Sequence, residues 1–211
     1  MQNQDKLQDV RNYFSHKLKE HGATPRGVDW NSEEAREPRF DQLAKVITST
    51  EEPVSVLDYG CGYGALADYF MAKRIPVSKY VGFDIVEDMV LAAQRRFVGV
   101  PSISFTANLE DIPQVDYAIA CGVFNMKLAT EYNEWTEFVV KSLAEMNRFS
   151  TRGFSANFLT KYSDADRMRP DLYYADPSFL FDYCKIHFSK NVALLHDYGI
   201  YDFTIIVRKD I

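Results

Sequence analysis

Apolar and polar residues follow two kinds of pattern along this chain. Short, mostly apolar runs stand at residues 54–57, 80–85, 102–106, 115–120 and 153–159. Runs with little polar alternation are typical of strands that are buried on both faces of a parallel sheet. Between them, apolar residues recur at helical spacing, as do Met89, Val90, Ala93 and Phe97. The pattern therefore predicts an α/β fold, in which helices alternate with a mostly parallel sheet.

The two ends of the chain depart from this alternation. Helical spacing covers residues 4–21 and resumes near Phe40, so helices are expected before the first strand. At the other end, apolar segments 191–196 and 201–208 flank a short turn and predict an antiparallel hairpin. We expect a single domain over residues 1–211, with a helical cover over 1–50 and a ligand-binding core over 51–211.

Three glycines follow the first predicted strand at every second position: Gly60, Gly62 and Gly64. Asp58 precedes them, and a helical pattern begins directly after them. Glycine permits positive φ angles and close approach of a ligand, and the helix start offers unpaired N–H groups. The arrangement predicts a nucleotide-type ligand at the carboxyl end of the first strand. Its spacing differs from the Gly-x-Gly-x-x-Gly fingerprint of dinucleotide-binding proteins.

An acidic residue, Asp84, ends the second predicted strand, twenty positions after Gly64. A carboxylate at this place in a strand–helix–strand unit is suited to accept hydrogen bonds from both ribose hydroxyls. The alternative interpretation is a residue that caps the following helix.

The pattern Asp-x-Gly-x-Gly-x-Gly, followed by Asp84 and a terminal hairpin, resembles the class I S-adenosylmethionine-dependent methyltransferases. The resemblance implies a Rossmann-like fold, S-adenosyl-L-methionine as the methyl donor and S-adenosyl-L-homocysteine as the product. The whole chain is also similar to a group of small bacterial methyltransferases without a settled acceptor.

The resemblance also assigns residues to the cofactor. In several of these families an arginine near the place of Arg39 binds the methionine carboxylate, although a surface ion pair is an equal alternative here. Asn108 stands where many members have an adenine-binding Asp, and it can still accept that hydrogen bond. The residues expected to contact the cofactor are Arg39, Asp58, Gly60, Gly62, Gly64, Asp84, Ile85, Asn108, Leu109 and Cys121.

Less can be said of the acceptor site. No base is recognisable beside Cys121, so it is interpreted as a small residue near the cofactor, and no catalytic residue is assigned. The irregular segment 160–177 follows the fifth predicted strand and is expected to overhang the site as a lid, where Arg169 would hold an anionic group. Core packing or a solvated loop is the alternative. The expected acceptor contacts are Trp30, Phe124, Asn125, Arg169 and Tyr173.

Composition narrows the choice of partners. The net charge is −6 and the sequence contains no basic stripe. Both observations argue against nucleic acid as a binding partner. No apolar run is long enough for a membrane span, and three scattered cysteines indicate a reducing, cytoplasmic setting. The four histidines show no metal-ligand spacing, and no metal is expected. We therefore expect methyl transfer to a small, polar molecule. The alternatives are a nicotinamide-dependent oxidoreductase and a non-catalytic cofactor-binding module, and the oligomeric state stays open.

Overall fold

The computed structural model describes residues 2–30, 32, 34 and 36–209, with side chains from Leu7 onward. Six α-helices occur in this part of the chain: α1 (Gln2–His21), α2 (Glu37–Leu43), α3 (Ala65–Lys73), α4 (Glu87–Arg96), α5 (Tyr132–Phe149) and α6 (Pro177–His187). The strands are β1 (Val54–Tyr59), β2 (Val77–Phe83), β3 (Ile103–Thr106), β4 (Val115–Ala120), β5 (Ser150–Thr160), β6 (Tyr174–Ala175), β7 (Asn191–Leu195) and β8 (Asp202–Arg208). Short 3-10 helices cover Pro25–Val28, Ala44–Val46, Leu109–Asp111 and Ala165–Arg167.

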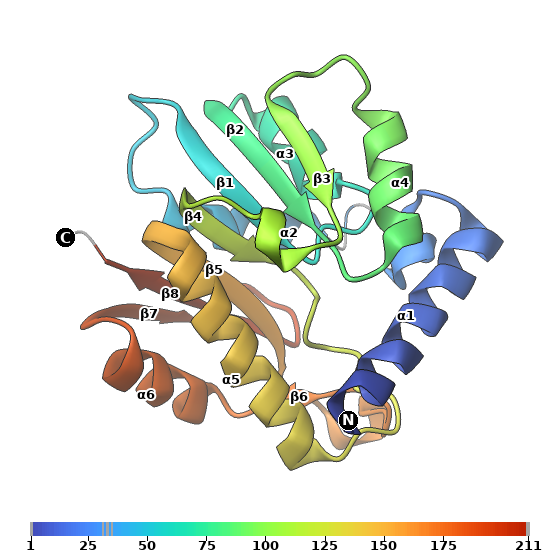
Figure 1. Ribbon diagram of the computed structural model, residues 1–211. Helices are drawn as coiled ribbons and strands as arrows, with labels where there is room; N and C mark the ends of the chain where they lie inside the picture. The colour runs from blue at the N-terminus through green and yellow to red at the C-terminus, as the bar shows by residue number, and fades with distance from the viewer. Residues whose placement is uncertain (1, 31, 33, 35, 210–211) are drawn as a thin grey trace.

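The described strands form one sheet in the order β3-β2-β1-β4-β5-β8-β7, with β6 attached to β5 (Figure 1). The pairs from β3 to β5 are parallel, whereas β8 is antiparallel to both β5 and β7. A mostly parallel sheet that ends in an antiparallel hairpin confirms the predicted fold class. The strand order reverses at β1 and β4, and in open α/β sheets the crevice at this switch point is where ligands bind.

Helices cover both faces of the sheet, which explains why the central strands β1 and β4 are mostly apolar. On one face, α5 and α6 pack over Leu57, Ala118 and Phe154. On the other face, α2, α3 and α4 pack over Val56 and Ile119. Successive strand residues point to opposite faces of the sheet. Neighbours such as Val56 and Leu57 therefore pack against helices on different faces.

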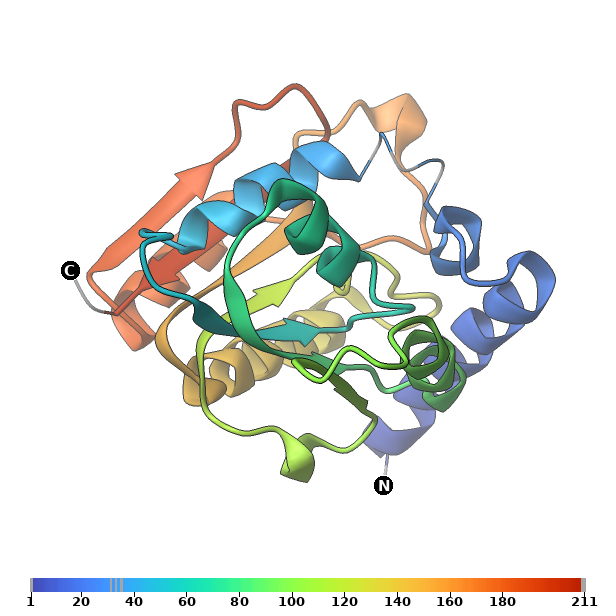
Figure 2. The ribbon, with the colours of Figure 1, turned by 90° about the horizontal axis from the view of Figure 1, so that it is seen from above.

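The amino-terminal segment lies at the side of the molecule, where α1 runs beside α4 (Figures 1 and 2). The described chain between β3 and β4 contains only the 3-10 helix Leu109–Asp111 in place of an α-helix. α1 packs Val10 and Phe14 into the same apolar cluster as α5. The cover that precedes β1 therefore helps to bury the α5 face of the sheet.

Two details differ from the sequence-based expectation. Strand β5 is longer than predicted, and Tyr174–Ala175 forms a short parallel strand against its end. The segment predicted to be an irregular lid is thus attached to the sheet in part.

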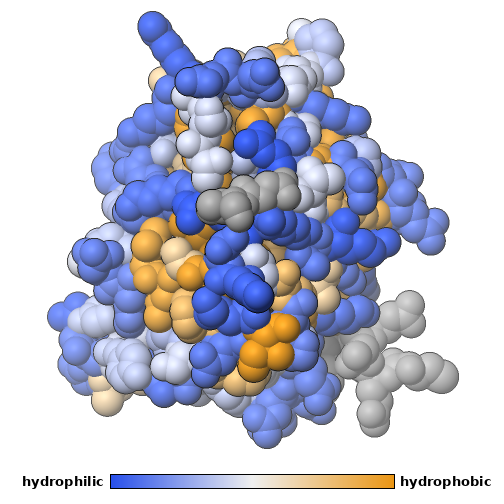
Figure 3. Space-filling model, turned by 90° about the vertical axis from the view of Figure 1, so that its left-hand side faces the viewer, coloured by the Kyte–Doolittle hydropathy of each residue, from blue (hydrophilic) through white to orange (hydrophobic). Residues whose placement is uncertain are grey.

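The side of the molecule that is on the left in Figure 1 carries β7 and α6. On this side, apolar patches lie among polar residues (Figure 3). Ile186 and Leu194 are exposed on these two elements, which do not line the cavities described below.

Candidate active site

The glycine-rich loop after β1 is held against the end of β2 by backbone hydrogen bonds. The N–H groups of Gly60 and Cys61 donate to the carbonyl of Phe83, at 2.7 and 2.9 Å. The Gly62 N–H donates to Asp84 Oδ2 at 2.8 Å. The other Asp84 oxygen accepts from the Val86 N–H at 2.9 Å, where α4 begins. Asp84 therefore links the loop to Val86, the residue just before α4, and both carboxylate oxygens keep further lone pairs.

The two acids of the predicted site, Asp58 and Asp84, are both buried. Burial raises the pKa of Asp84 to about 6, although the two backbone N–H donors oppose this shift. Burial raises the pKa of Asp58 to about 7, a shift that the hydroxyl of Tyr80 opposes and the charge of Asp84 reinforces. The Tyr80 hydroxyl donates directly to Asp58. Asp84 is therefore mostly ionised at neutral pH, whereas Asp58 is partly protonated there.

Two neighbouring cavities lie at this edge of the sheet. The larger has a volume of about 400 Å³ and the smaller about 50 Å³. Asp84, Ile85 and Leu109 line the larger cavity, whereas Asp58 and Arg36 line the smaller one. Five residues line both and mark where the cavities meet: Val28, Trp30, Gly60, Gly62 and Cys121.

Most residues that the sequence assigned to the cofactor meet at these cavities. The residues that line at least one cavity are Asp58, Gly60, Gly62, Asp84, Ile85, Leu109 and Cys121. Cys121 is half-buried, and burial raises the pKa of its thiol far above the ordinary value. A thiol that keeps its proton is a packing residue rather than a nucleophile.

Three of the predicted cofactor residues lie elsewhere. Gly64 lies against aromatic side chains, since a Cβ on it would be 2.7 Å from the Phe97 ring. Asn108 is exposed, and its Oδ1 accepts from the Glu110 N–H at 3.2 Å, so its side chain caps a 3-10 helix. Arg39 forms an ion pair within the protein, which is described next. None of the three lines either cavity.

The Arg39 guanidinium forms a bidentate ion pair with Asp202 on β8. Nε and Nη2 of Arg39 lie 2.7 and 2.8 Å from the two carboxylate oxygens. The Arg39 side chain is 13% exposed and that of Asp202 is 0% exposed. The structure therefore favours the internal ion pair over the carboxylate-binding role expected for Arg39. Arg36, one turn earlier, lines the smaller cavity instead, and its Nη1 donates to the Tyr63 hydroxyl at 2.5 Å.

The ion pair belongs to a closed ring of five residues that reaches the cavities. Asn157 Nδ2 donates to Asp202 at 2.6 Å, and its Oδ1 accepts from the Gly122 N–H at 2.8 Å. Gly122 lies so close to the Trp30 indole that a Cβ there would overlap it. The Arg39 guanidinium carbon lies 4.6 Å from the centroid of the Trp30 indole, and this contact closes the set of five residues. Trp30, which lines both cavities, is thus fixed by both α2 and the sheet.

The predicted acceptor residues are mostly placed elsewhere. Trp30 lines the cavities, but Phe124 is fully buried and stacks on Phe158 with ring centroids 5.1 Å apart. Tyr173 is 1% exposed, and its hydroxyl lies 2.9 Å from Thr136 Oγ1. Both rings therefore belong to the core, where a ligand has no access to them.

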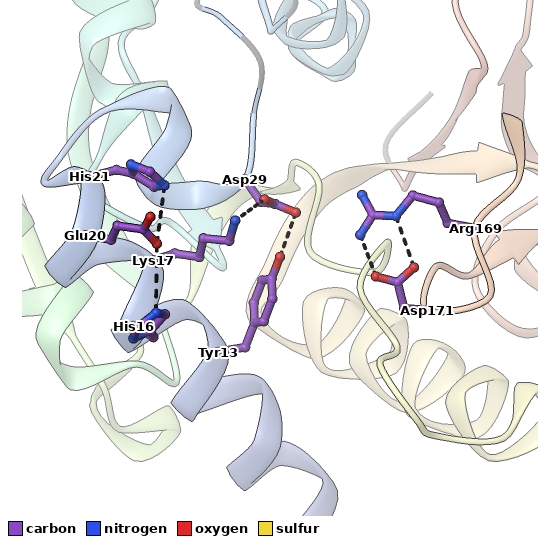
Figure 4. A network of polar contacts seen from close by, with 8 residues as sticks. All are labelled: Tyr13, His16, Lys17, Glu20, His21, Asp29, Arg169 and Asp171. Carbon is purple, nitrogen blue, oxygen red and sulfur yellow. Dashed lines mark hydrogen bonds and ion pairs between the residues drawn. The ribbon is translucent and has the colours of Figure 1, made fainter.

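Asn125 and Arg169 also engage groups of the protein rather than the cavities. The Asn125 side-chain oxygen accepts from the Leu159 N–H at 3.4 Å, and its backbone carbonyl accepts from the Tyr173 N–H at 2.8 Å. Arg169 pairs with Asp171 at 2.5 Å, and the pair faces Asp29 across a gap (Figure 4). The hydrogen bond to Asp171 raises the pKa of Arg169. The expected anion-binding role of Arg169 therefore has no support from its position.

Sequence reasoning missed the part of the larger cavity that lies between α1 and α5. Leu7, Val10 and Phe14 come from α1, and Trp135 and Phe138 from α5. The helical spacing of the α1 residues indicates an apolar face, but it cannot show that a cavity remains beneath that face. In the described part of the chain, no helix is both long and apolar enough to cross a membrane. No group of three or more His, Cys, Asp or Glu residues suited to a metal occurs there either.

Comparison with known proteins identifies the family. The family described as "Methyltransferase domain" matches residues 56–153, which include the glycine-rich loop. The Mycobacterium tuberculosis (strain ATCC 25618 / H37Rv) protein Rv1506c, named as a methyltransferase, is 48% identical over 163 residues, which are 77% of this chain and 98% of that protein. This match includes nearly all of the relative.

Solved structures share the fold at low identity. The N-methyltransferase NodS of Bradyrhizobium japonicum WM9, solved with S-adenosyl-L-homocysteine, has a TM-score of 0.65 at 14% identity, over 95% of this chain and 98% of NodS. The small RNA methyltransferase HEN1 has a TM-score of 0.60 at 14% identity, over 83% of this chain and 25% of that one. Together with the relative, these findings show that the chain belongs to the class I S-adenosylmethionine-dependent methyltransferases.

Proposed function

We propose that this methyltransferase acts on a small, polar molecule that binds in the larger cavity beside the cofactor. The observation that carries the proposal is the cavity itself, which extends from the predicted ribose site at Asp84 to the faces of α1 and α5. A concave site with mostly apolar walls and a few polar groups is typical of small-molecule binding.

The cavities also fit the cofactor. The methionine part of S-adenosylmethionine fits the smaller cavity, where the Arg36 guanidinium suits a carboxylate. The adenosine part fits the larger cavity, where Asp84 is placed to accept hydrogen bonds from the ribose and Leu109 lies at the expected adenine site. The cofactor supplies a methyl group on a sulfonium, which the junction of the two cavities, at Trp30 and Cys121, would present to an acceptor. Orientation of the acceptor can provide much of the rate acceleration, so the proposal needs no nucleophile.

Charge argues against a nucleic-acid acceptor. Phosphate backbones are bound by clustered Lys and Arg. Among the described residues that line the larger cavity, Lys141 is the one Lys or Arg side chain, and it stands beside Glu137 and Glu145. The chain as a whole carries a net charge of −6. The resemblance to the small RNA methyltransferase therefore supports a shared fold and not a shared acceptor.

The test is a transfer assay with S-adenosylmethionine that carries a labelled methyl group. The protein is incubated separately with a library of small polar metabolites, with total RNA and with total soluble protein. The proposal expects label in one or more small molecules. Efficient labelling of RNA or protein, with none of the metabolites labelled, would overturn it.

A further inference from the structure

On the placement proposed above, the adenosine part lies at Asp84 and Leu109, which leaves open the part of the larger cavity between α1, α5 and the ends of β1 and β2. We call this part the α1–α5 chamber. Its lining residues are Leu7, Val10, Phe14, Tyr59, Phe83, Trp135, Phe138, Lys141, Ser142 and Glu145. The chain between β3 and β4 forms only a 3-10 helix, and α1 covers this region from the side.

The walls of the α1–α5 chamber are largely aromatic. The Tyr59 and Phe83 rings form its floor, with centroids 5.2 Å apart. On α5, Trp135 and Phe138 pack together with ring centroids 4.8 Å apart. Burial of an apolar molecule against such walls is favourable in proportion to the area removed from water. The chamber therefore suits a ligand with an apolar body.

A polar pair, made by the buried Tyr59 and the half-buried Glu145, interrupts these apolar walls. The Tyr59 hydroxyl, on a residue that is 6% exposed, donates to Glu145 Oε2 at 2.7 Å. Burial raises the pKa of Tyr59, so the hydroxyl keeps its proton and acts as the donor. An ionised carboxylate has about four acceptor positions on its two oxygens. Glu145 therefore has the capacity to accept a hydrogen bond from a ligand as well.

The charges around the chamber favour a positive group on that ligand. Glu145 is half-buried in the chamber, and Lys141 is an exposed lining residue. Elsewhere on the same helix, Glu134 and Glu137 are exposed and line the larger cavity, where solvent weakens their effect. An anionic ligand would meet repulsion from these carboxylates, whereas a protonated amine would be attracted. An amine also donates charge-assisted hydrogen bonds, which are stronger than neutral ones.

We propose that the α1–α5 chamber binds the methyl acceptor, and that the acceptor is a small molecule with an apolar body and a protonated amine. The inference rests on the proposed function and narrows its substrate class. It replaces the expectation of an anionic acceptor held by Arg169.

The chain has a built-in reporter for this test, because its two tryptophans, Trp30 and Trp135, both line the larger cavity. Three probes that share a phenyl ring are titrated into protein saturated with S-adenosylhomocysteine: 2-phenylethylamine, 2-phenylethanol and 3-phenylpropanoate. Tryptophan fluorescence measures the binding. We expect the amine to bind at least about tenfold more tightly than the carboxylate, with the alcohol between them.

Substitutions in the chamber should move these affinities in opposite directions. Glu145→Gln should weaken the amine about tenfold, as expected for loss of a charged partner, and change the alcohol less than twofold. Lys141→Gln should strengthen the amine and weaken the carboxylate. Glu51→Gln removes one carboxylate from an exposed position outside both cavities, and should leave all three affinities unchanged.

Several outcomes would overturn the inference. Equal affinity for the amine and the carboxylate would do so, as would amine affinity that neither Glu145→Gln nor Lys141→Gln alters. Displacement of S-adenosylhomocysteine by the amine would assign the chamber to the cofactor. The labelled-methyl assay separates this inference from the proposed function. Transfer to small molecules without amine binding contradicts the inference alone, whereas amine binding with transfer only to RNA or protein contradicts the proposed function.

Discussion

Arg39 and Asp202 lie 163 positions apart in the chain and form a two-pronged ion pair, with distances of 2.7 and 2.8 Å. The pair joins the helix before the first strand to the last strand of the sheet. Through Trp30 it also reaches the point where the two cavities meet.

Removal of the Arg39 guanidinium should therefore lower the free energy of unfolding. Arg39→Ala leaves the fully buried Asp202 carboxylate with one side-chain hydrogen-bond partner within the described residues, Asn157. Breaking a buried pair by removing one partner typically costs about 3–5 kcal/mol. Denaturant unfolding should show a loss of this order, and the double variant Arg39→Ala/Asp202→Asn should recover part of it. A loss below about 0.5 kcal/mol in the single variant, the level of ordinary surface substitutions, would show that the pair is not structural.

Arg36 should matter for the cofactor in a way that Arg39 does not. Arg36→Lys keeps the charge beside the smaller cavity but loses the planar, two-pronged geometry that suits a carboxylate. We expect S-adenosylhomocysteine to bind about tenfold more weakly, measured by calorimetry, which corresponds to about 1.4 kcal/mol. The control ligand is 5′-methylthioadenosine, which lacks the amino-acid part and should bind as it does to the wild type. Equal weakening of both ligands would place Arg36 outside the carboxylate site.

Gly62 and Gly99 form a matched pair for testing the glycine-rich loop. Both have positive φ, +51° and +83°, so an alanine at either position is strained. A Cβ on Gly62 would lie 3.0 Å from Val28 at the cavity junction, whereas one on Gly99 would meet open space. Each alanine should cost roughly 1–3 kcal/mol of stability. Only Gly62→Ala should also reduce the affinity for S-adenosylhomocysteine. If the two variants bound S-adenosylhomocysteine equally well, the loop would have a structural role only.

The raised pKa of Asp58, about 7, gives the stability of the protein a specific pH dependence. Unfolded aspartate has a pKa of about 3.9, so the folded state binds the proton more tightly. This contribution to stability is complete below pH 4 and is lost as the pH rises through 7. Asp58→Asn removes the titration, so the variant should lose less stability than the wild type between pH 5 and 8. Parallel pH profiles of the unfolding free energy would contradict the assignment.

Tyr173→Phe should affect stability without affecting the site. The hydroxyl pairs with Thr136 at 2.9 Å on a side chain that is 1% exposed and outside both cavities. Loss of one such hydrogen bond typically costs about 0.5–1.5 kcal/mol. A double-mutant cycle with Thr136→Val should assign most of that cost to the pair. A twofold change in affinity corresponds to roughly 0.4 kcal/mol. If Tyr173→Phe changed the affinity for S-adenosylhomocysteine by more than about twofold, Tyr173 would have to be assigned to the ligand site after all.

The sequence predicts the sheet well because buried parallel strands leave a plain signal. β1 and β4 are mostly apolar, and burial on both faces favours that composition. The loop at Gly60 and Gly62 and the acid at Asp84 were also predictable, because they follow strand ends that meet at one edge of the sheet.

The side chains that depend on distant contacts were not predictable. Arg36 and Arg39 lie one turn apart, and the partner that separates their roles, Asp202 on β8, is 163 positions from Arg39 in the sequence. Tyr173 stands in an irregular segment of ordinary polarity, and its burial depends on packing against α5. The α1–α5 chamber depends on how closely two helices approach, which hydrophobic spacing alone does not specify.

The ring through Asp202, Arg39 and Trp30 also has a consequence for the order in which the molecule assembles. Trp30 and Arg39 are made well before their anchor, Asp202, which follows Arg39 by 163 positions and lies in β8. Contacts between such distant segments form late, since the intervening chain must first be ordered. During synthesis the chain therefore lacks the anchor that fixes Trp30 until β8 has been made, and the junction of the two cavities is completed only after β8 has joined the sheet.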